Sequence, residues 1–379
     1  MKLLRLRVSM LALCAGVVSV YCHRAAAAPF VPTRDDVVVE TLREKPLDEE
    51  ERVWRALKAA WRLQPNDLGV SLQLARSAIE RARREGDPRL MGTAQAALAP
   101  WWAAPKAPAA VMLLRATIRQ STHDFESALL DLNALLSNEA RTPQVIAVQA
   151  RFTRASVYQV LAQYPQAQND CTALLMAAPI EAGACLAELR SLTDVLASKT
   201  AAHDLAALYA QASPLQRGWL SLMQAELAER MGQSAQADRF YRQALAADAS
   251  SYTLGAYADF LIDHARAAEV PALLKDKARI DPLLLRLALA WQATGDAPRA
   301  DQARRALQAR FDAAHARGDK VHLREEARFM LTLAGKPVEA LALAKANWAV
   351  QKEPADAKLL AQCVQAANKA ANQAKGASL

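Results

Sequence analysis

The sequence predicts an all-α protein built as a solenoid of helical hairpins. Residues 109–179 contain two copies of one pattern, and each copy holds two apolar periodicities of helical spacing. With 12 Gly and 7 each of Phe, Tyr and Trp among 379 residues, the composition also favours helices over a β-fold. A solenoid suits the length, because each hairpin packs only on its neighbours and no single large core is required.

The two copies keep one register. Matching residues are separated by the same 39 positions: Arg115 and Arg154, Phe125 and Tyr164, Ala128 and Ala167, Asp131 and Asp170. A constant offset indicates a structural repeat, with one helix–turn–helix unit per copy. The Arg and Asp of each copy are predicted to form a structural ion pair, because a repeated pair supports a repeated interface.

The second copy resembles the tetratricopeptide repeat, a helical hairpin of about 34 residues with small and aromatic residues at fixed positions. Ala155 and Tyr158 match positions of its first helix, Tyr164 and Ala167 open its second helix, and Pro179 closes the unit. Small residues are needed where two helices cross at close range. The resemblance implies a right-handed α-solenoid of roughly seven hairpins, several of them degenerate.

Residues 1–27 have the pattern of a secretory signal peptide. A short basic start precedes the apolar run Val8–Cys22, and Ala25–Ala28 supply the small residues that signal peptidase requires. The run is short for a transmembrane helix, and an uncleaved anchor is the alternative interpretation. Cleavage after Ala27 predicts an exported protein, periplasmic or else secreted, with no membrane span in the mature chain.

The rest of the chain divides into a leader, a solenoid and a tail. Residues 28–46 are either extended along the first helices or disordered. Residues 47–372 form the solenoid, whose family positions are clearest at 109–179 and 218–249. The last helix, from Pro354, is polar enough to be the solvating cap of the array, and residues 373–379 form a frayed tail.

Punctuating residues set the expected helix boundaries within the solenoid. Acids at 48–51 begin a helix that ends at Leu63, the next helix turns back at Gly86–Pro88, and Pro100–Pro105 is a connector with two adjacent Trp. The expected later hairpins are 180–213 (worn), 218–249, 252–281 (looser), 283–310 and 321–352.

The charge does not favour nucleic acid as a partner. Four basic residues lie in the signal segment without a compensating acid, so cleavage lowers the formal net charge by four, from +8 to +4. The remaining Lys and Arg are interleaved with Asp and Glu along a long array, which is weak support for phosphate binding.

No pattern of a catalytic, cofactor or metal site is present in the sequence. No two histidines have the i, i+3 or i+4 spacing of helical ligands, and no cysteine pair forms a zinc knuckle. There is neither a Gly-x-Ser-x-Gly elbow nor a Gly-rich phosphate loop. Some lytic transglycosylases begin with a helical superhelix, but nothing after residue 320 resembles their catalytic signature. The sequence therefore predicts no enzyme, cofactor or metal.

Three cysteines remain after cleavage: Cys171, Cys185 and Cys363. Cys171 and Cys185 lie at similar distances on either side of Pro179, on neighbouring antiparallel helices. A disulfide between them is geometrically possible, and export permits it. Two small buried thiols suit the same positions equally, so both interpretations stay open.

In the tetratricopeptide family the first helix of each hairpin lines the concave face, with its fifth, ninth and twelfth residues pointing inward. The resemblance places these residues there: Leu113, Thr117 and Gln120, then Phe152, Ser156 and Gln159, and Glu226 in a later copy. Apolar groups flanked by amides and hydroxyls suit an extended peptide. Solvated side chains or contacts between repeats are the simpler alternative.

These observations predict a non-catalytic solenoid of the bacterial cell envelope that binds another protein or an extended peptide in its concave groove. The alternative is a structural scaffold or assembly subunit of an envelope complex, acting through the convex face or the termini. Fold resemblance does not identify the partner.

Overall fold

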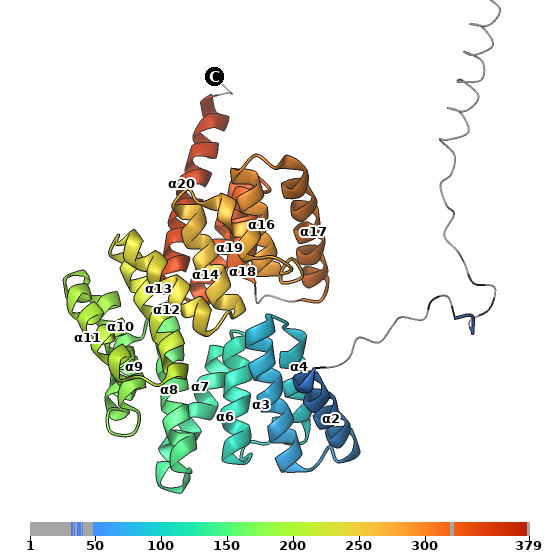
Figure 1. The fold of residues 1–379 in the computed structure, drawn as a ribbon, viewed down its shortest axis with the longest axis vertical. Helices are drawn as coiled ribbons and strands as arrows, with labels where there is room; N and C mark the ends of the chain where they lie inside the picture. Colours follow the sequence, from blue (N-terminus) through green and yellow to red (C-terminus); the bar gives the residue numbers. More distant parts are fainter. Residues whose placement is uncertain are drawn as a thin grey trace, which may run out of the picture. The chain divides into compact units, whose positions relative to one another are not determined.

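The computed structural model describes residues 48–318 and 322–376, together with residues 32, 34, 36–38 and 40. The predicted signal peptide, residues 1–27, lies outside the described residues, as does most of the predicted leader, 28–46. The described residues form α-helices and short 3-10 turns and contain no strand. Residues Val53–Leu379 form one compact unit, in which the all-α solenoid of hairpins is confirmed (Figure 1).

Successive helices pair as antiparallel hairpins along the unit (Figure 1). The helices are α2 Glu49–Leu63, α3 Leu68–Glu85, α4 Arg89–Ala97, α5 Ala99–Trp102, α6 Ala109–Ser121, α7 Phe125–Ser137, α8 Gln144–Val160, α9 Tyr164–Ala173, α10 Pro179–Thr193, α11 Ser198–Gln211, α12 Pro214–Arg230, α13 Ser234–Ala247, α14 Ser251–Asp263, α15 Val270–Leu273, α16 Asp281–Ala293, α17 Ala297–Ala316, α18 Leu323–Thr332, α19 Pro337–Val350 and α20 Pro354–Gly376.

The hairpins share one kind of turn. Two positions before the second helix, a residue adopts the left-handed conformation: His123, Ala162, Gly232, Gly295 and Gly335 have φ between 56° and 79°. The N–H of the next residue then donates to a carbonyl five residues back, as from Asp124 to Arg119 and from Gln163 to Tyr158, or six back after Gly335. This Schellman arrangement satisfies carbonyls that the end of the first helix leaves free, so the chain reverses without orphaned polar groups.

A buried alanine marks the middle of the first helix in most hairpins. These alanines have at most 1% of their surface exposed: Ala116, Ala155, Ala225, Ala258, Ala288 and Ala327. A larger side chain at such a point would separate the helices, since interiors are close-packed and inserted methylenes force backbone shifts. The alanine thus sets both the close approach of each hairpin and the face that its first helix turns inward.

The two predicted ion pairs are present. Arg115 Nη2 lies 2.5 Å from Asp131 Oδ1, and both side chains are buried; Arg154 Nη2 lies 2.6 Å from Asp170 Oδ1. Arg115 also donates to the carbonyls of Trp101 and Trp102, at the end of the short helix α5. The connector predicted at 100–105 is therefore partly helical, and both of its Trp side chains pack against the N-terminal core.

Two other segments differ from the expectation. The hairpin at 180–213, expected to be worn, forms the full helices α10 and α11, which bury Ala184, Ala187, Ala201 and Leu205. The hairpin at 252–281 is looser, as predicted, because its second helix α15 begins at Val270 and ends after one turn. The last helix, α20, continues past Asn372 to Gly376.

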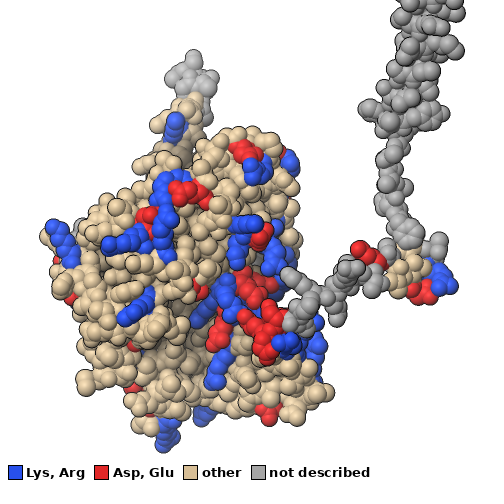
Figure 2. All heavy atoms as spheres, in the orientation of Figure 1, with Lys and Arg blue, Asp and Glu red and all other residues tan. Residues whose placement is uncertain are grey.

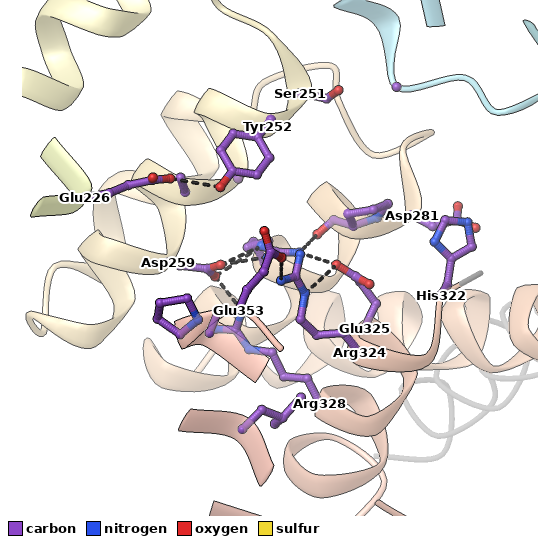
Figure 3. A pocket seen from close by; sticks show the side chains of 18 of the residues that line it. Glu226, Ser251, Tyr252, Asp259, Asp281, His322, Arg324, Glu325, Arg328 and Glu353 are labelled. Atoms are coloured by element: carbon purple, nitrogen blue, oxygen red, sulfur yellow. Dashed lines mark hydrogen bonds and ion pairs between the residues drawn. The ribbon is translucent and has the colours of Figure 1, made fainter. Parts of the chain in front are cut away.

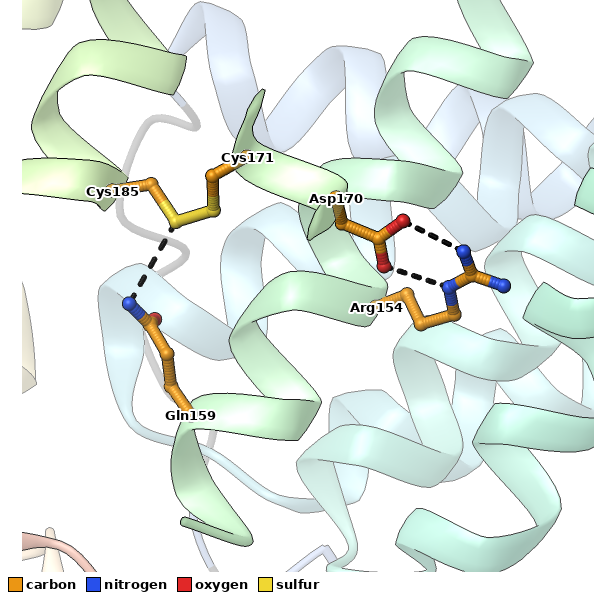
Figure 4. Close-up of a disulfide and its surroundings, with 5 residues drawn as sticks. All are labelled: Arg154, Gln159, Asp170, Cys171 and Cys185. Atoms are coloured by element: carbon orange, nitrogen blue, oxygen red, sulfur yellow. Dashed lines mark hydrogen bonds and ion pairs between the residues drawn. A yellow bond between two sulfur atoms is a disulfide. The ribbon is translucent and has the colours of Figure 1, made fainter. Parts of the chain in front are cut away.

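Cys171 of α9 and Cys185 of α10 are joined by a disulfide, with their Cα atoms 6.0 Å apart (Figure 4). Both residues are buried, and the bond connects two consecutive hairpins close to the ion pair of Arg154 and Asp170. Of the two interpretations of these cysteines, the structure has the disulfide. Cys363 is free and buried in α20, and burial raises the pKa of its thiol.

The same glycine substitution is expected to have opposite effects at two helical positions. A Cβ atom at Gly218 of α12 would lie 2.7 Å from Ala247 Cβ at the end of α13, whereas nothing lies within 4 Å of one at Gly92 of α4. Alanine is favoured over glycine in a helix by about 1 kcal/mol, so Gly92→Ala should raise the free energy of unfolding. Gly218→Ala should lower it by about 1–3 kcal/mol, because α12 and α13 must move apart. Urea unfolding of both variants measures the difference, and a stabilised Gly218→Ala variant would contradict this packing.

Candidate functional site

The inward faces of the first helices line a large cavity within the unit. Its volume is about 1820 Å³, and its lining comes from α3, α8, α10, α12, α14, α16, α18 and the start of α20. Ligand pockets for small molecules usually measure about 300–1,000 Å³, so this cavity is larger than a small ligand requires. We refer to it as the central cavity.

The central cavity is bordered by contacts that close the array between segments far apart in the sequence. At one end of it, Ser251 Oγ at the start of α14 donates to the carbonyl of Arg83 in the last turn of α3, at 3.1 Å. Gly86 permits this approach, because a Cβ atom there would lie 2.9 Å from Ile280. We call this contact and the two described next the closure contacts.

The C-terminal helices make the other two closure contacts. The N–H of Lys352 donates to the carbonyl of Val160, the last residue of α8, at 2.7 Å. Lys358 Nζ of α20 lies 2.5 Å from Asp263 Oδ2, at the end of α14. These contacts bring the C-terminal helices to the concave face that carries the central cavity.

One wall of the central cavity is a compensated ion network. Asp259 of α14 lies 2.7 Å from Arg286 Nη2 of α16 and 2.6 Å from Arg328 Nη1 of α18 (Figure 3). Burial by itself raises the pKa of Asp259, but the two guanidinium groups outweigh it and hold the pKa at about 2. This carboxylate stays charged at neutral pH and joins three hairpins.

A second part of the lining holds carboxylates with less compensation. Glu226 of α12 accepts a hydrogen bond of 2.9 Å from Tyr252 Oη (Figure 3). Glu188 of α10 lies near enough for its charge to act on Glu226. Burial raises the pKa of Glu226 to about 7, and the negative charge of Glu188 adds to the effect. Burial likewise raises the pKa of Glu188, which Arg230 lowers in part. We call Glu188 and Glu226 the acidic wall.

The side chain of Tyr252 lies beside the acidic wall. It has 57% of its surface exposed, and the negative charge of Glu226, together with burial, raises the pKa of its hydroxyl well above 10. The exposed surface of Tyr252 belongs to the central cavity, where its ring lies beside the Glu226 carboxylate. The aromatic ring and the nearby carboxylates together favour the binding of a cationic group.

The residues predicted for the groove separate into two groups. Ser156, Gln159 and Glu226 line the central cavity, and Gln120 Nε2 donates to Ser156 Oγ at 3.3 Å. Leu113, Thr117 and Phe152 form the second group, which lies outside this lining and makes packing contacts or local hydrogen bonds. Leu113 packs against the N-terminal core, Thr117 Oγ1 donates to the carbonyl of Leu113, and Phe152 makes an edge contact with Trp219. Whether any of the seven binds a partner stays a prediction.

The C-terminal hairpins also contribute cavity residues, which were not predicted from the sequence. Ser156, Glu226, Asp259 and Arg328 each directly follow the buried alanine of their helix, namely Ala155, Ala225, Ala258 and Ala327. Asp259 and Arg328 therefore occupy the same helix position as Glu226. The sequence contains this pattern, but it has so many alanines that it does not show which of them are buried between helices.

Charge elsewhere on the surface is mixed. On the face drawn in Figure 2, acidic and basic side chains are interspersed over the array. Within the described part of the chain, no three His, Cys, Asp or Glu side chains are grouped so that they could hold a metal ion. Among the helices of those same residues, none has the length and apolar character needed to cross a membrane.

No family model matches the sequence, and no curated protein matches it. Solved structures with a similar arrangement include the Cut9–Hcn1 hetero-tetramer of APC/C, at 13% identity and a TM-score of 0.45, covering 83% of this chain and 59% of that one. A tetratricopeptide repeat protein from Parabacteroides merdae has 14% identity and a TM-score of 0.32, covering 77% and 99%. The TPR domain of P58(IPK) has 13% identity and a TM-score of 0.23, covering 85% and 94%.

The assignment of the architecture rests on the hairpins themselves. They repeat a buried alanine in the first helix and a left-handed turn residue before the second helix. The chain is a tetratricopeptide-like solenoid. In such a solenoid each hairpin adds one inward-facing helix, so the central cavity is the surface that the repeat itself generates.

The raised pKa of Glu226 predicts a pH-dependent stability. Between its unfolded pKa of 4.5 and its folded pKa of about 7, the native state binds this proton more tightly than the unfolded chain does. Stability from this group therefore falls as pH rises through that window and stays low above it. Glu226→Gln should match wild type near pH 4 and be more stable at pH 8 by on the order of 1 kcal/mol, since water in the cavity screens part of the effect.

Urea unfolding at both pH values measures the difference between Glu226→Gln and wild type. Glu339→Gln is the matched control, because Glu339 lies outside the central cavity and pairs with Lys336 in the open. It should show no such gain at pH 8. A Glu226→Gln variant less stable than wild type at pH 8 would contradict the assignment of an uncompensated carboxylate.

Proposed function

We propose that the protein binds an extended segment of another protein in the central cavity and catalyses no reaction. The size and lining of the cavity carry this proposal. Its volume of about 1820 Å³ exceeds a small-molecule site, and hydroxyl, amide and charged side chains from several hairpins alternate around it. An extended peptide needs hydrogen-bond partners for its backbone and pockets for its side chains, and such a lining supplies both.

The proposal places this interaction in the bacterial cell envelope, with the periplasm as the compartment. The support is the signal-peptide pattern of residues 1–27 and the disulfide of Cys171 and Cys185, a bond that persists in oxidising compartments. The partner is a protein or peptide, without nucleic acid. The scaffold function, acting through the convex face or the termini, is an alternative outcome of the same test.

Site-specific photocrosslinking in the source cells tests the proposal. A photoreactive phenylalanine derivative replaces Tyr252, which projects into the central cavity, or Leu215, which is 90% exposed and lies outside the cavity lining. We expect one protein to be captured through position 252 and not through position 215. Capture should weaken at least ten-fold when Ser156 and Gln159 are both replaced by Arg, because the cavity is then narrowed at α8.

Capture through position 215 alone would favour the scaffold function and contradict the proposal. Capture through both positions with equal efficiency would also contradict it, because a ligand held in the cavity does not reach the start of α12. Far-UV circular dichroism of each variant checks that the helices are retained.

A further inference from the structure

The segment Gln351–Glu353 is the one non-helical stretch between α19 and α20, and it lines the central cavity. Gln351 has φ −140° and ψ 147°, which is extended backbone. The N–H of Lys352 donates to the carbonyl of Val160 at 2.7 Å, which gives the last residue of α8 a partner 192 positions away in the chain. The carbonyl of Val160 has no partner within its own helix, and an extended peptide ligand would make the same hydrogen bond to it.

Glu353 carries the same charge as the acidic wall, and its negative charge acts on both Glu188 and Glu226. Among the described residues its ion pair is with Arg324 of α18, with Nη1 and Oε2 3.1 Å apart (Figure 3). Like charges facing one another in a partly buried site are unfavourable, so the segment is an occupant that a better-matched one can displace.

Displacement of the Glu353 side chain leaves Arg324 with other partners. Arg324 also lies 3.5 Å from Asp356 Oδ1 and 3.8 Å from Glu325 Oε1, so it keeps carboxylates when Glu353 moves away. The base of the segment is fixed separately, because Asn347 Nδ2 donates to Asp356 Oδ1 at 2.8 Å between α19 and α20. Gln351 Nε2 and the N–H of Glu353 also donate to Asp356, so the ends of the segment stay fixed. What can leave is the Glu353 side chain, from Arg324, and the N–H of Lys352, from Val160.

We propose that the Gln351–Glu353 segment occupies the place of the peptide ligand in the central cavity, and that the ligand carries Lys or Arg where the segment carries Glu353. This inference rests on the proposed function and specifies its ligand. Two observations carry it: an extended backbone already docked on α8, and an acidic wall that faces an acid. A ligand cation would meet Glu188 and Glu226 and the exposed ring of Tyr252, all of which favour positive charge.

Two fluorescent ten-residue peptides test the charge preference. One copies residues 347–356, and the other is the same peptide with Glu353→Lys. Measured by fluorescence anisotropy with the purified protein, the Lys peptide should bind at least ten-fold tighter than the unchanged copy. The double variant Glu188→Gln and Glu226→Gln should remove this preference.

Proline at position 352 tests the occupancy of the site. Lys352→Pro removes the N–H that bonds to Val160, and the extended Gln351 before it suits proline, so the segment should detach. The Lys peptide should then bind several-fold tighter than to wild type. Lys352→Ala keeps the N–H and should bind like wild type.

Equal affinity for the two peptides, together with no gain in Lys352→Pro, would overturn the inference while the proposed function stands. Failure of both peptides to bind wild type and Lys352→Pro would also overturn it. The proposed function is then judged by capture through position 252, which does not depend on the charge of the ligand or on this segment.

Discussion

The close approach of two helices at a buried alanine is the constraint on which the rest of this structure depends. Ala155, Ala225, Ala258 and Ala327 are almost without exposed surface, and each fixes how its helix is rotated in the hairpin. Because the next residue along a helix is turned by about 100°, the residue after the alanine faces inward. The cavity residues Ser156, Glu226, Asp259 and Arg328 are positioned in this way by packing that is entirely apolar.

The turn chemistry reinforces this arrangement. A left-handed residue before most of the second helices lets the carbonyls at the end of the first helix find donors, so these hairpins are satisfied locally. Hairpins that are complete in themselves can stack without a shared core, and the buried Arg–Asp pairs then act within hairpins. Long-range contacts are then needed only to close the array. The closure contacts use few groups: the carbonyls of Arg83 and Val160 and the carboxylate of Asp263.

The sequence was sufficient to predict the hairpins, the Arg–Asp pairs and most helix boundaries, because these depend on residues close together in the chain. It was sufficient for Ser156, Gln159 and Glu226 as inward-facing residues, since their copies keep the family register. Closure was not predictable, because it results from small rotations added from hairpin to hairpin, which no local pattern encodes. The contributions of Arg328 and Glu353 to the cavity depend on closure and were missed for that reason.

Zero-length carbodiimide coupling, read out by mass spectrometry on monomeric protein, tests most directly whether the array closes around the cavity. Lys358 and Asp263 are 95 residues apart in the chain, yet their charged groups touch and are partly exposed. The account predicts an amide between them, formed as readily as one between the neighbouring pair Lys336 and Glu339. Coupling of the neighbouring pair without any link between residues 263 and 358 would contradict this closure contact.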